Sequence, residues 1–370
     1  MMTRQTLTKA RSAALFAVCF LASTYGIGIA GRLYLPPPDA KELTDKIETI
    51  GPAIGTIDTV AVGSSRMLHA FDPDMFDQAA GRTGCTVRSY NLGIGGMNLI
   101  EMRYVLRQLA ARHPPHLRRV LFDPPNDIHV EFENLKSQRT WVTTDPRDAP
   151  IAIADILSHP DPRKYSSLAR YLMAFLYHNS ALGLASRYLT PAVPPSEDPL
   201  APEQAAPDQE TARRGYVPLD PAEVPTVERL GLLQDHDLFI RAAHRLQDAA
   251  AEQIAQAPID AAQEDRRIAV IRSMAGFIRR LGYEPILISL PDTYGESITD
   301  AQDLEATFDR PDTGLPVVNF MDKADARIIY DTRSWYDWGH LTETVARYVS
   351  MTAAERLCRR FGSAFMSVGR

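Results

Sequence analysis

The chain has 370 residues, enough for one large α/β domain or two smaller ones with a sizeable core. Its hydrophobic fraction of 45% and charged fraction of 23% are those of an ordinary globular protein. The net charge is −6, and the chain has no Lys/Arg block, RNA-binding aromatic signature or zinc-finger spacing, so nucleic acid is not an expected partner. The three cysteines form no Cys-x-x-Cys pair, and their pattern leaves the redox compartment open.

The N-terminal segment, residues 1–32, predicts a membrane anchor or a signal segment. Three basic residues precede a run without any charge, 12–31. That run is about long enough to cross a hydrocarbon core of roughly 30 Å, and the basic flank predicts a cytoplasmic N-terminus. Small residues at 28–30 make a cleaved signal peptide the alternative, but the run is longer than a usual signal-peptide core, which favours a retained anchor. Both interpretations export the rest of the chain.

Residues 33–44 predict a stiff, extended spacer, because successive prolines fix φ and remove backbone donors. The folded domain is expected over 45–370. Within it, the ranges 56–63, 87–91 and 118–123 are typical of short strands, and the segment between the second and third has the apolar spacing of a helix. Its apolar face consists of Leu99, Met102, Leu106 and Leu109. This alternation predicts an α/β fold with a parallel sheet.

The same alternation returns in the last third of the chain. A helix is predicted over 266–281, ahead of a buried strand over 284–291. A short strand over 316–320 then precedes a final helix from about 342 to 360. We therefore expect one sheet that is interrupted and then resumed.

Residues 150–260 differ in composition and are interpreted as an insertion into the domain. The range 165–189 is helical and rich in large apolar residues, and we expect it to pack on the core, with a lid or a membrane contact as the alternative. Prolines crowd the range 191–225, which predicts a surface loop. Deletion of 195–222 is therefore predicted to leave a folded protein.

Three loops follow the first three predicted strands, and in a parallel sheet they meet at the edge where ligands bind. The first loop contains Ser64 and Ser65 after a glycine, the second is the glycine-rich run 91–96, and the third contains Asn126. Together they offer a hydroxyl nucleophile, backbone N–H groups that glycines leave accessible, and a side-chain amide. The alternative is a plain strand-to-helix turn in which Ser64 or Ser65 caps the next helix.

A base and an orienting carboxylate stand just before the final predicted helix. Only two residues separate Asp337 from His340, so the carboxylate can fix the imidazole tautomer while the imidazole takes a serine proton. The alternative is that Asp337 or Thr342 caps the helix and His340 is a surface residue.

Four blocks of the sequence resemble those of the SGNH/GDSL hydrolases, in the same order. They are VAVGSSR (60–66), YNLGIGGMN (90–98), DPPND (123–127) and DWGH (337–340). The resemblance implies a flavodoxin-like three-layer α/β/α fold. It also implies Ser65 as the nucleophile, Asp337 and His340 as its triad partners, and an oxyanion hole formed by the N–H groups of Ser65 and Gly96 with the Asn126 side chain.

The chain departs from the family pattern at two positions. Ser64 stands where the family usually has Asp, and Pro124 stands where it usually has Gly. The Pro-Pro pair that begins at 124 changes the path of the loop that carries Asn126.

The anchor, the GSSR start and the DWGHLTETVARY segment are similar to membrane-tethered bacterial SGNH proteins, alginate O-acetyltransferase-like proteins among them. Those proteins act with membrane-bound O-acyltransferases on cell-surface polysaccharides or teichoic acids. The similarity implies a single-pass protein of the bacterial cytoplasmic membrane whose domain is periplasmic. Its activity would be that of a serine esterase or O-acyltransferase on an acyl ester of a carbohydrate, through an acyl-enzyme and without a cofactor. The rivals are a non-catalytic carbohydrate-binding or assembly protein of the same fold, and a lipase or thioesterase.

Overall fold

The computed structural model describes residues 4–35, 41–123, 138–147, 149–158, 163–189, 213–220, 261–291, 304–308, 314–320, 323–337 and 339–362. The chain divides into two compact units. The helical unit comprises Met1–Ala40 and His129–Gln204, and the α/β unit comprises Lys41–Ile128 and Ala205–Arg370.

The α/β unit is built on a five-stranded parallel sheet with the strand order β2-β1-β3-β4-β5. The strands are β1 (Thr59–Val62), β2 (Ser89–Asn91), β3 (Arg119–Phe122), β4 (Glu284–Ile288) and β5 (Val317–Val318). Each lies inside a range that the sequence predicts as a strand. The order is that of flavodoxin-like folds, in which the direction of winding reverses between β1 and β3. The predicted α/β fold with one interrupted parallel sheet is confirmed.

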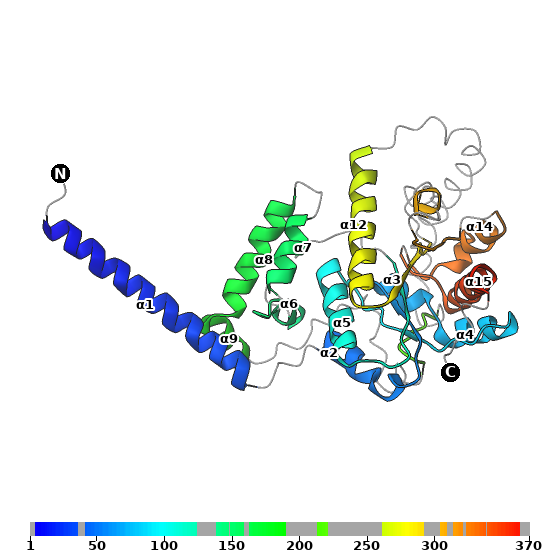
Figure 1. The fold of residues 1–370 in the computed structure, drawn as a ribbon, viewed down its shortest axis with the longest axis horizontal. Coiled ribbons are helices and arrows are strands. Elements are labelled where there is room, and N and C mark those ends of the chain that lie inside the picture. The colour runs from blue at the N-terminus through cyan, green and yellow to red at the C-terminus, as the bar shows by residue number, and fades with distance from the viewer. Residues whose placement is uncertain are drawn as a thin grey trace, which may run out of the picture. The chain divides into compact units, whose positions relative to one another are not determined.

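Helices cover both faces of this sheet, as a three-layer α/β/α arrangement requires (Figure 1). Ala61, Leu121 and Ile286 are register neighbours on three strands and contribute to the apolar core on one face. That core also includes side chains of α3 (Ser65–Ala70), α4 (Pro73–Arg82) and α15 (Glu343–Phe361). The other face is covered by α5 (Leu99–Ala111) and α12 (Ala261–Arg280) (Figure 1). Shorter helical elements are α2 (Lys41–Thr49), η1 (Gly51–Ala53), α14 (Lys323–Ile329) and η4 (Thr332–Ser334).

The α/β unit starts earlier than the sequence suggests. Helix α2 begins at Lys41, inside the range 33–44 that was predicted as an extended spacer, and its Leu43 is fully buried. Burial of one apolar face stabilises this helix, which outweighs its weak sequence signal. Tyr34 also belongs to a helix, and the prolines at 36–38 lie outside the described residues.

Residues 213–220 belong to the α/β unit, although they fall inside the predicted insertion and its surface loop. The Tyr216 and Leu219 side chains are buried, and the Arg214 guanidinium pairs with Asp74 and Asp77 on α4. The prediction that 195–222 can be deleted is therefore wrong, because the deletion removes these buried contacts. The rest of the proline-rich range lies outside the described residues.

The helical unit contains five described helices. Its second stretch begins at 129, whereas the insertion was predicted to begin at 150. They are α1 (Arg4–Tyr34), α6 (Gln138–Thr143), α7 (Ala149–Ser158), α8 (Lys164–His178) and α9 (Ala181–Leu189). The predicted helical range 165–189 is confirmed as helix, but it is broken at Asn179 and Ser180. Helix α8 packs against α6, α7 and α9 inside this unit.

Helix α1 is long and apolar enough to span a membrane. The qualifying stretch is Arg11–Tyr34, with a mean hydropathy of 1.9, and it is the one such helix among the described residues. Only 6% of its most apolar window is buried inside the protein. This exposure argues against a core helix, since a core helix would be covered by protein, and it is compatible with a membrane-spanning helix.

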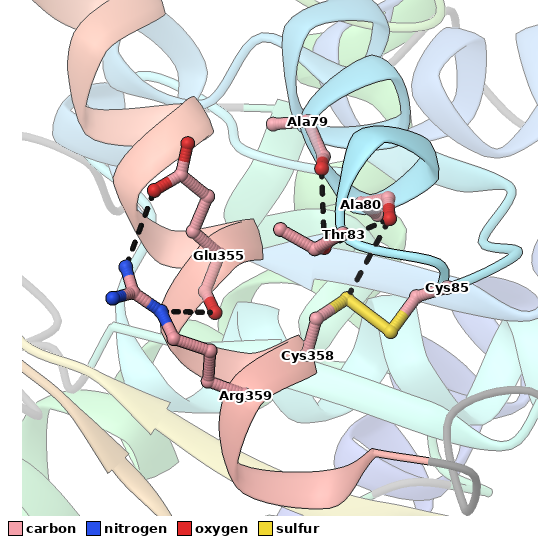
Figure 2. The surroundings of a disulfide bond; sticks show 7 residues. All are labelled: Ala79, Ala80, Thr83, Cys85, Glu355, Cys358 and Arg359. Carbon is pink, nitrogen blue, oxygen red and sulfur yellow. Dashed lines mark hydrogen bonds and ion pairs between the residues drawn. A yellow bond between two sulfur atoms is a disulfide. The ribbon is translucent and has the colours of Figure 1, made fainter.

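A disulfide joins Cys85, just after α4, to Cys358 in the last turns of α15 (Figure 2). The two cysteines are 273 residues apart in the sequence, with their Cα atoms separated by 6.1 Å. The bridge reinforces the packing of α15 against α4. Disulfides persist mainly in oxidising compartments, and the cysteine pattern alone gave no sign of this pairing.

Removal of the disulfide is expected to destabilise the α/β unit. Replacing both cysteines by alanine should lower the free energy of unfolding by about 2–4 kcal/mol, because the unfolded chain then gains conformational freedom. Urea denaturation of the full chain measures the loss, and dithiothreitol should cause a loss of similar size in the wild type. Cys19→Ala, at the free cysteine in α1, is the control and should leave the urea midpoint unchanged. A wild-type midpoint that dithiothreitol does not move would contradict the role of the bridge.

Candidate active site

Ser65 is the first residue of α3, and it follows the end of β1 after a two-residue turn. Gly63 in that turn has no room for a side chain, since a Cβ atom there would lie 2.8 Å from the Cβ of Met67. Ser64 occupies the N-cap position but makes no side-chain capping hydrogen bond, so capping does not explain the pair of serines. The turn stands where the sheet reverses its winding, between β1 and β3, and open α/β sheets bind their ligands at such points.

An ion pair holds this turn to the loop after β3. The Arg66 guanidinium donates to the Asp123 carboxylate at 2.9 Å, and the Asp123 side chain is only 3% exposed. The Asp123 backbone N–H also donates to the carbonyl of Val62 at 3.2 Å. These two contacts therefore fix the start of the loop after β3 relative to the start of the loop after β1. Pro124 and the predicted oxyanion donor Asn126 lie outside the described residues.

The glycine-rich loop after β2 lies directly against α3. The Ile94 N–H donates to the Gly63 carbonyl at 3.1 Å, which places this loop beside the serine turn. The Met97 N–H donates to the Ile94 carbonyl at 3.1 Å and closes a turn in which Gly96 has φ of +61°, a conformation that favours glycine. Gly96 is exposed, and among the described residues its N–H has no hydrogen-bond acceptor. The loop that Ile94 ties to the serine turn thus carries an accessible backbone donor, of the kind that an oxyanion hole uses.

Asp337 and His340 form a hydrogen-bonded pair in the loop before α15. Both carboxylate oxygens of Asp337 lie 2.8 Å from Nδ1 of His340. An ionised carboxylate only accepts hydrogen bonds, so we assign the imidazole proton to Nδ1, which leaves Nε2 of the neutral ring as the basic atom. The backbone N–H groups of Gly339 and His340 donate to the same carboxylate at 2.8 and 2.9 Å.

The environment of Asp337 keeps its carboxyl group ionised. Burial acts to raise its pKa, but the hydrogen bond and charge of His340, with the two backbone N–H groups, outweigh burial and hold the pKa below its usual value. An ionised Asp337 stabilises a positive charge on the neighbouring ring. The pair therefore has the electrostatics that a general base needs when it takes a proton.

His69 connects the serine helix to this pair. Its ring packs edge-on against the ring of His340, with the centroids 5.1 Å apart and the planes at 84°. His69 lies four residues after Ser65 on α3, and residues at this spacing share one face of a helix. The contact therefore places the His340 ring against a residue that is about one helical turn from Ser65. No hydrogen bond joins Ser65 to His340 in the described part of the chain. Sequence reasoning missed His69, whose only signal was its spacing from Ser65.

His69 is held by the segment 213–220. Its Nδ1 lies 2.8 Å from the carbonyl of Val217, a group that only accepts, so we assign the proton to Nδ1. Burial, reinforced by the nearby His340, lowers the pKa of His69 to about 4. The ring is consequently neutral at ordinary pH. The same segment reaches the start of α15, where the Glu343 N–H donates to the carbonyl of Leu219 at 3.1 Å, so it ties together the elements that carry the serine and the histidine.

The lowered pKa of His69 predicts a loss of stability in mild acid. Between about pH 6.5 and pH 4 the unfolded chain binds this proton and the folded protein does not, so the free energy of unfolding decreases as the pH falls. The contribution from His69 is roughly 2 kcal/mol between pH 7 and pH 5. Urea denaturation at both pH values should show a smaller decrease for His69→Asn than for the wild type. The exposed His116→Gln is the matched control and should keep the wild-type decrease; equal decreases for all three proteins would refute the assignment.

Comparison with protein-family models, with curated proteins and with solved structures found no match for this chain. The flavodoxin-like strand order and the arrangement of the site residues are therefore the features that characterise the α/β unit. Of the predicted site residues, Ser65 and Gly96 lie in or beside neighbouring loops at the carboxyl end of the sheet. Asp337 is hydrogen-bonded to His340, and the His340 ring contacts His69 on the helix that begins at Ser65. Asn126 is outside the described residues.

Proposed function

We propose that the α/β unit is a serine esterase or O-acyltransferase of the SGNH/GDSL type. The observation that carries the proposal is the contact between His69 and His340, because it joins the Asp337–His340 pair to the helix that begins at Ser65. A hydroxyl nucleophile, a base with its free nitrogen defined and an orienting carboxylate are the parts that nucleophilic acyl transfer needs.

The reaction follows from these positions. Nε2 of His340 takes the hydroxyl proton of Ser65 as the Ser65 oxygen bonds to the ester carbonyl carbon. The N–H groups of Ser65 and Gly96 stabilise the negative oxygen of the tetrahedral intermediate. The ester oxygen then leaves with the proton from His340, and the acyl group remains on Ser65. Water or a sugar hydroxyl gives its proton to His340 and bonds to the acyl carbon, and His340 passes that proton to the Ser65 oxygen as the acyl bond to Ser65 breaks, which restores the free enzyme.

The place of action in this proposal is the periplasmic side of a bacterial cytoplasmic membrane. Helix α1 supports a single-pass anchor, its basic start supports a cytoplasmic N-terminus, and the Cys85–Cys358 bridge supports an oxidising compartment. The similarity of the anchor, the GSSR start and the DWGHLTETVARY segment to membrane-tethered bacterial SGNH proteins supports a carbohydrate ester as the substrate and a membrane-bound O-acyltransferase as the source of the acyl group.

Labelling with a fluorophosphonate probe tests the proposal, together with turnover of p-nitrophenyl acetate by the full-length protein in detergent. We expect covalent labelling of one site and measurable release of p-nitrophenol. Mass spectrometry with an added oligosaccharide then separates transfer from hydrolysis, since transfer yields an acylated sugar. If the protein binds polysaccharide but shows neither labelling nor turnover, the non-catalytic carbohydrate-binding alternative replaces this proposal.

A further inference from the structure

The last turns of α1 are packed against the helical unit, close to the break between α8 and α9. A Cβ atom on Gly28 would lie 2.2 Å from the carbonyl oxygen of Asn179, and one on Gly31 would lie 2.3 Å from the side chain of Leu184. Glycine at both positions therefore lets α9 approach the backbone of α1, as Figure 1 shows for the two helices. The anchor and the α8–α9 pair form one packed body.

The charged residue that ends the apolar run of α1 also binds to this unit. Arg32 donates to the carbonyl of Thr144 at 3.0 Å, and its guanidinium lies over the Trp141 ring at 4.1 Å from the centroid. The Asn179 side chain donates to the same Thr144 carbonyl at 3.0 Å. Arg32, at the end of the apolar run, and Asn179, at the α8–α9 break, thus bind the same carbonyl group, which fixes their relative positions.

Helix α8 exposes its apolar face. Its buried face consists of Ser167, Tyr171, Ala174 and His178. The opposite face, at the spacing of successive helical turns, is exposed and consists of Tyr165, Leu172, Met173 and Leu176. Leu182 at the start of α9 is 70% exposed. A soluble helix presents polar residues on such a face, so this distribution indicates a contact with an apolar medium or partner.

The place on α1 that contacts the α8–α9 break identifies the apolar medium. The uncharged run 12–31 is about 30 Å long at 1.5 Å per residue, which matches the hydrocarbon thickness of a bilayer, so Gly28 lies near its far boundary. Asn179 touches Gly28 and therefore lies at the same depth. Leu176 and Leu182 lie three residues before and three residues after Asn179, within about one helical turn of that depth.

We propose that the exposed apolar face of α8 and α9 is seated in the interface of the bilayer that α1 crosses, with Leu172, Met173, Leu176 and Leu182 among the lipid acyl chains. The inference rests on the part of the proposed function in which α1 is a membrane anchor. The protein is then held by one spanning helix and by one interfacial surface. That surface buries its apolar side chains at the boundary of headgroups and acyl chains, as amphipathic interfacial helices do.

Site-directed fluorescence quenching in lipid vesicles tests this seat. The full-length protein with Cys19→Ala receives one new cysteine at a time, carries an NBD fluorophore there, and is reconstituted alone into phosphatidylcholine vesicles. The lipids carry bromine either near the headgroup or deep in the acyl chains. Leu176→Cys and Leu182→Cys are the test sites and Leu21→Cys, near the middle of α1, is the deep reference. Ile328→Cys on α14 is the matched control, because Ile328 is 41% exposed and Leu176 is 47% exposed.

We expect shallow bromine to quench Leu176 and Leu182 by at least half of the loss that deep bromine causes at Leu21, and Ile328 to remain unquenched. Quenching at Leu21 without quenching at Leu176 and Leu182 would overturn the seat and assign the face to a protein partner in the membrane. No quenching at Leu21 would overturn the anchor and the seat together, whereas loss of esterase activity alone leaves both intact. Circular dichroism of each labelled variant verifies that its helix content is unchanged.

Discussion

The Ser65→Ala variant is expected to lose fluorophosphonate labelling, and its turnover of an ester should fall by about four to six orders of magnitude. In the proposed reaction Ser65 supplies the oxygen that bonds to the acyl carbon, and it stands at the start of α3, one helical turn from the histidine that contacts His340. Alanine fits the same position, since α3 begins without a side-chain cap and the turn depends on Gly63. Turnover and labelling of the purified full-length protein measure the effect.

Ser64→Ala is the matched control for this prediction, because Ser64 is the adjacent serine in the same turn. It makes no capping hydrogen bond, so the variant should keep most of the activity and all of the labelling. His340→Ala combined with Ser65→Ala should lose little more than either single variant, because nucleophile and base act as a unit. Full activity of Ser65→Ala on an ester, or loss of labelling with Ser64→Ala instead, would show that the nucleophile has been misassigned.

The parts of the fold that the sequence predicted are those with a local signal. Each strand of the sheet is a short apolar run, and α15 has apolar residues at helical spacing, so pattern alone locates them. The flavodoxin-like order of the strands was implied only by the resemblance to the SGNH/GDSL hydrolases, since local patterns locate strands without ordering them. The serine turn and the Asp337–His340 pair were predictable for the same reason, since each is a short motif beside one element.

The parts that the sequence did not predict depend on contacts between distant segments. Cys85 and Cys358 have ordinary neighbours in the sequence, and only the packing of α15 on α4 brings them together. The segment 213–220 lies in proline-rich surroundings, and its Arg214 finds its carboxylate partners on α4, far away in the sequence. His69 acquires its role from a ring contact with His340 that no local pattern describes.

The Asp337→Asn variant should fold normally and lose about four orders of magnitude in kcat. The new amide oxygen can still accept the N–H groups of Gly339 and His340, which holds the loop in place. Its NH₂ group, however, donates where the carboxylate accepted, so it favours the His340 tautomer with the proton on Nε2. That tautomer cannot take the proton of Ser65. The negative charge that stabilises the imidazolium is also lost.

Steady-state kinetics and thermal unfolding together separate this effect from misfolding. The kcat and kcat/KM should fall by similar factors while the unfolding temperature changes little, since the lost interaction acts in the transition state. Asp331→Asn is the matched control: Asp331 lies six residues upstream and pairs with Arg333 on the surface, so its loss should leave kcat unchanged. A loss of kcat below about tenfold in Asp337→Asn would mean that the carboxylate only shapes the loop, because a tautomer that blocks proton transfer costs far more than that.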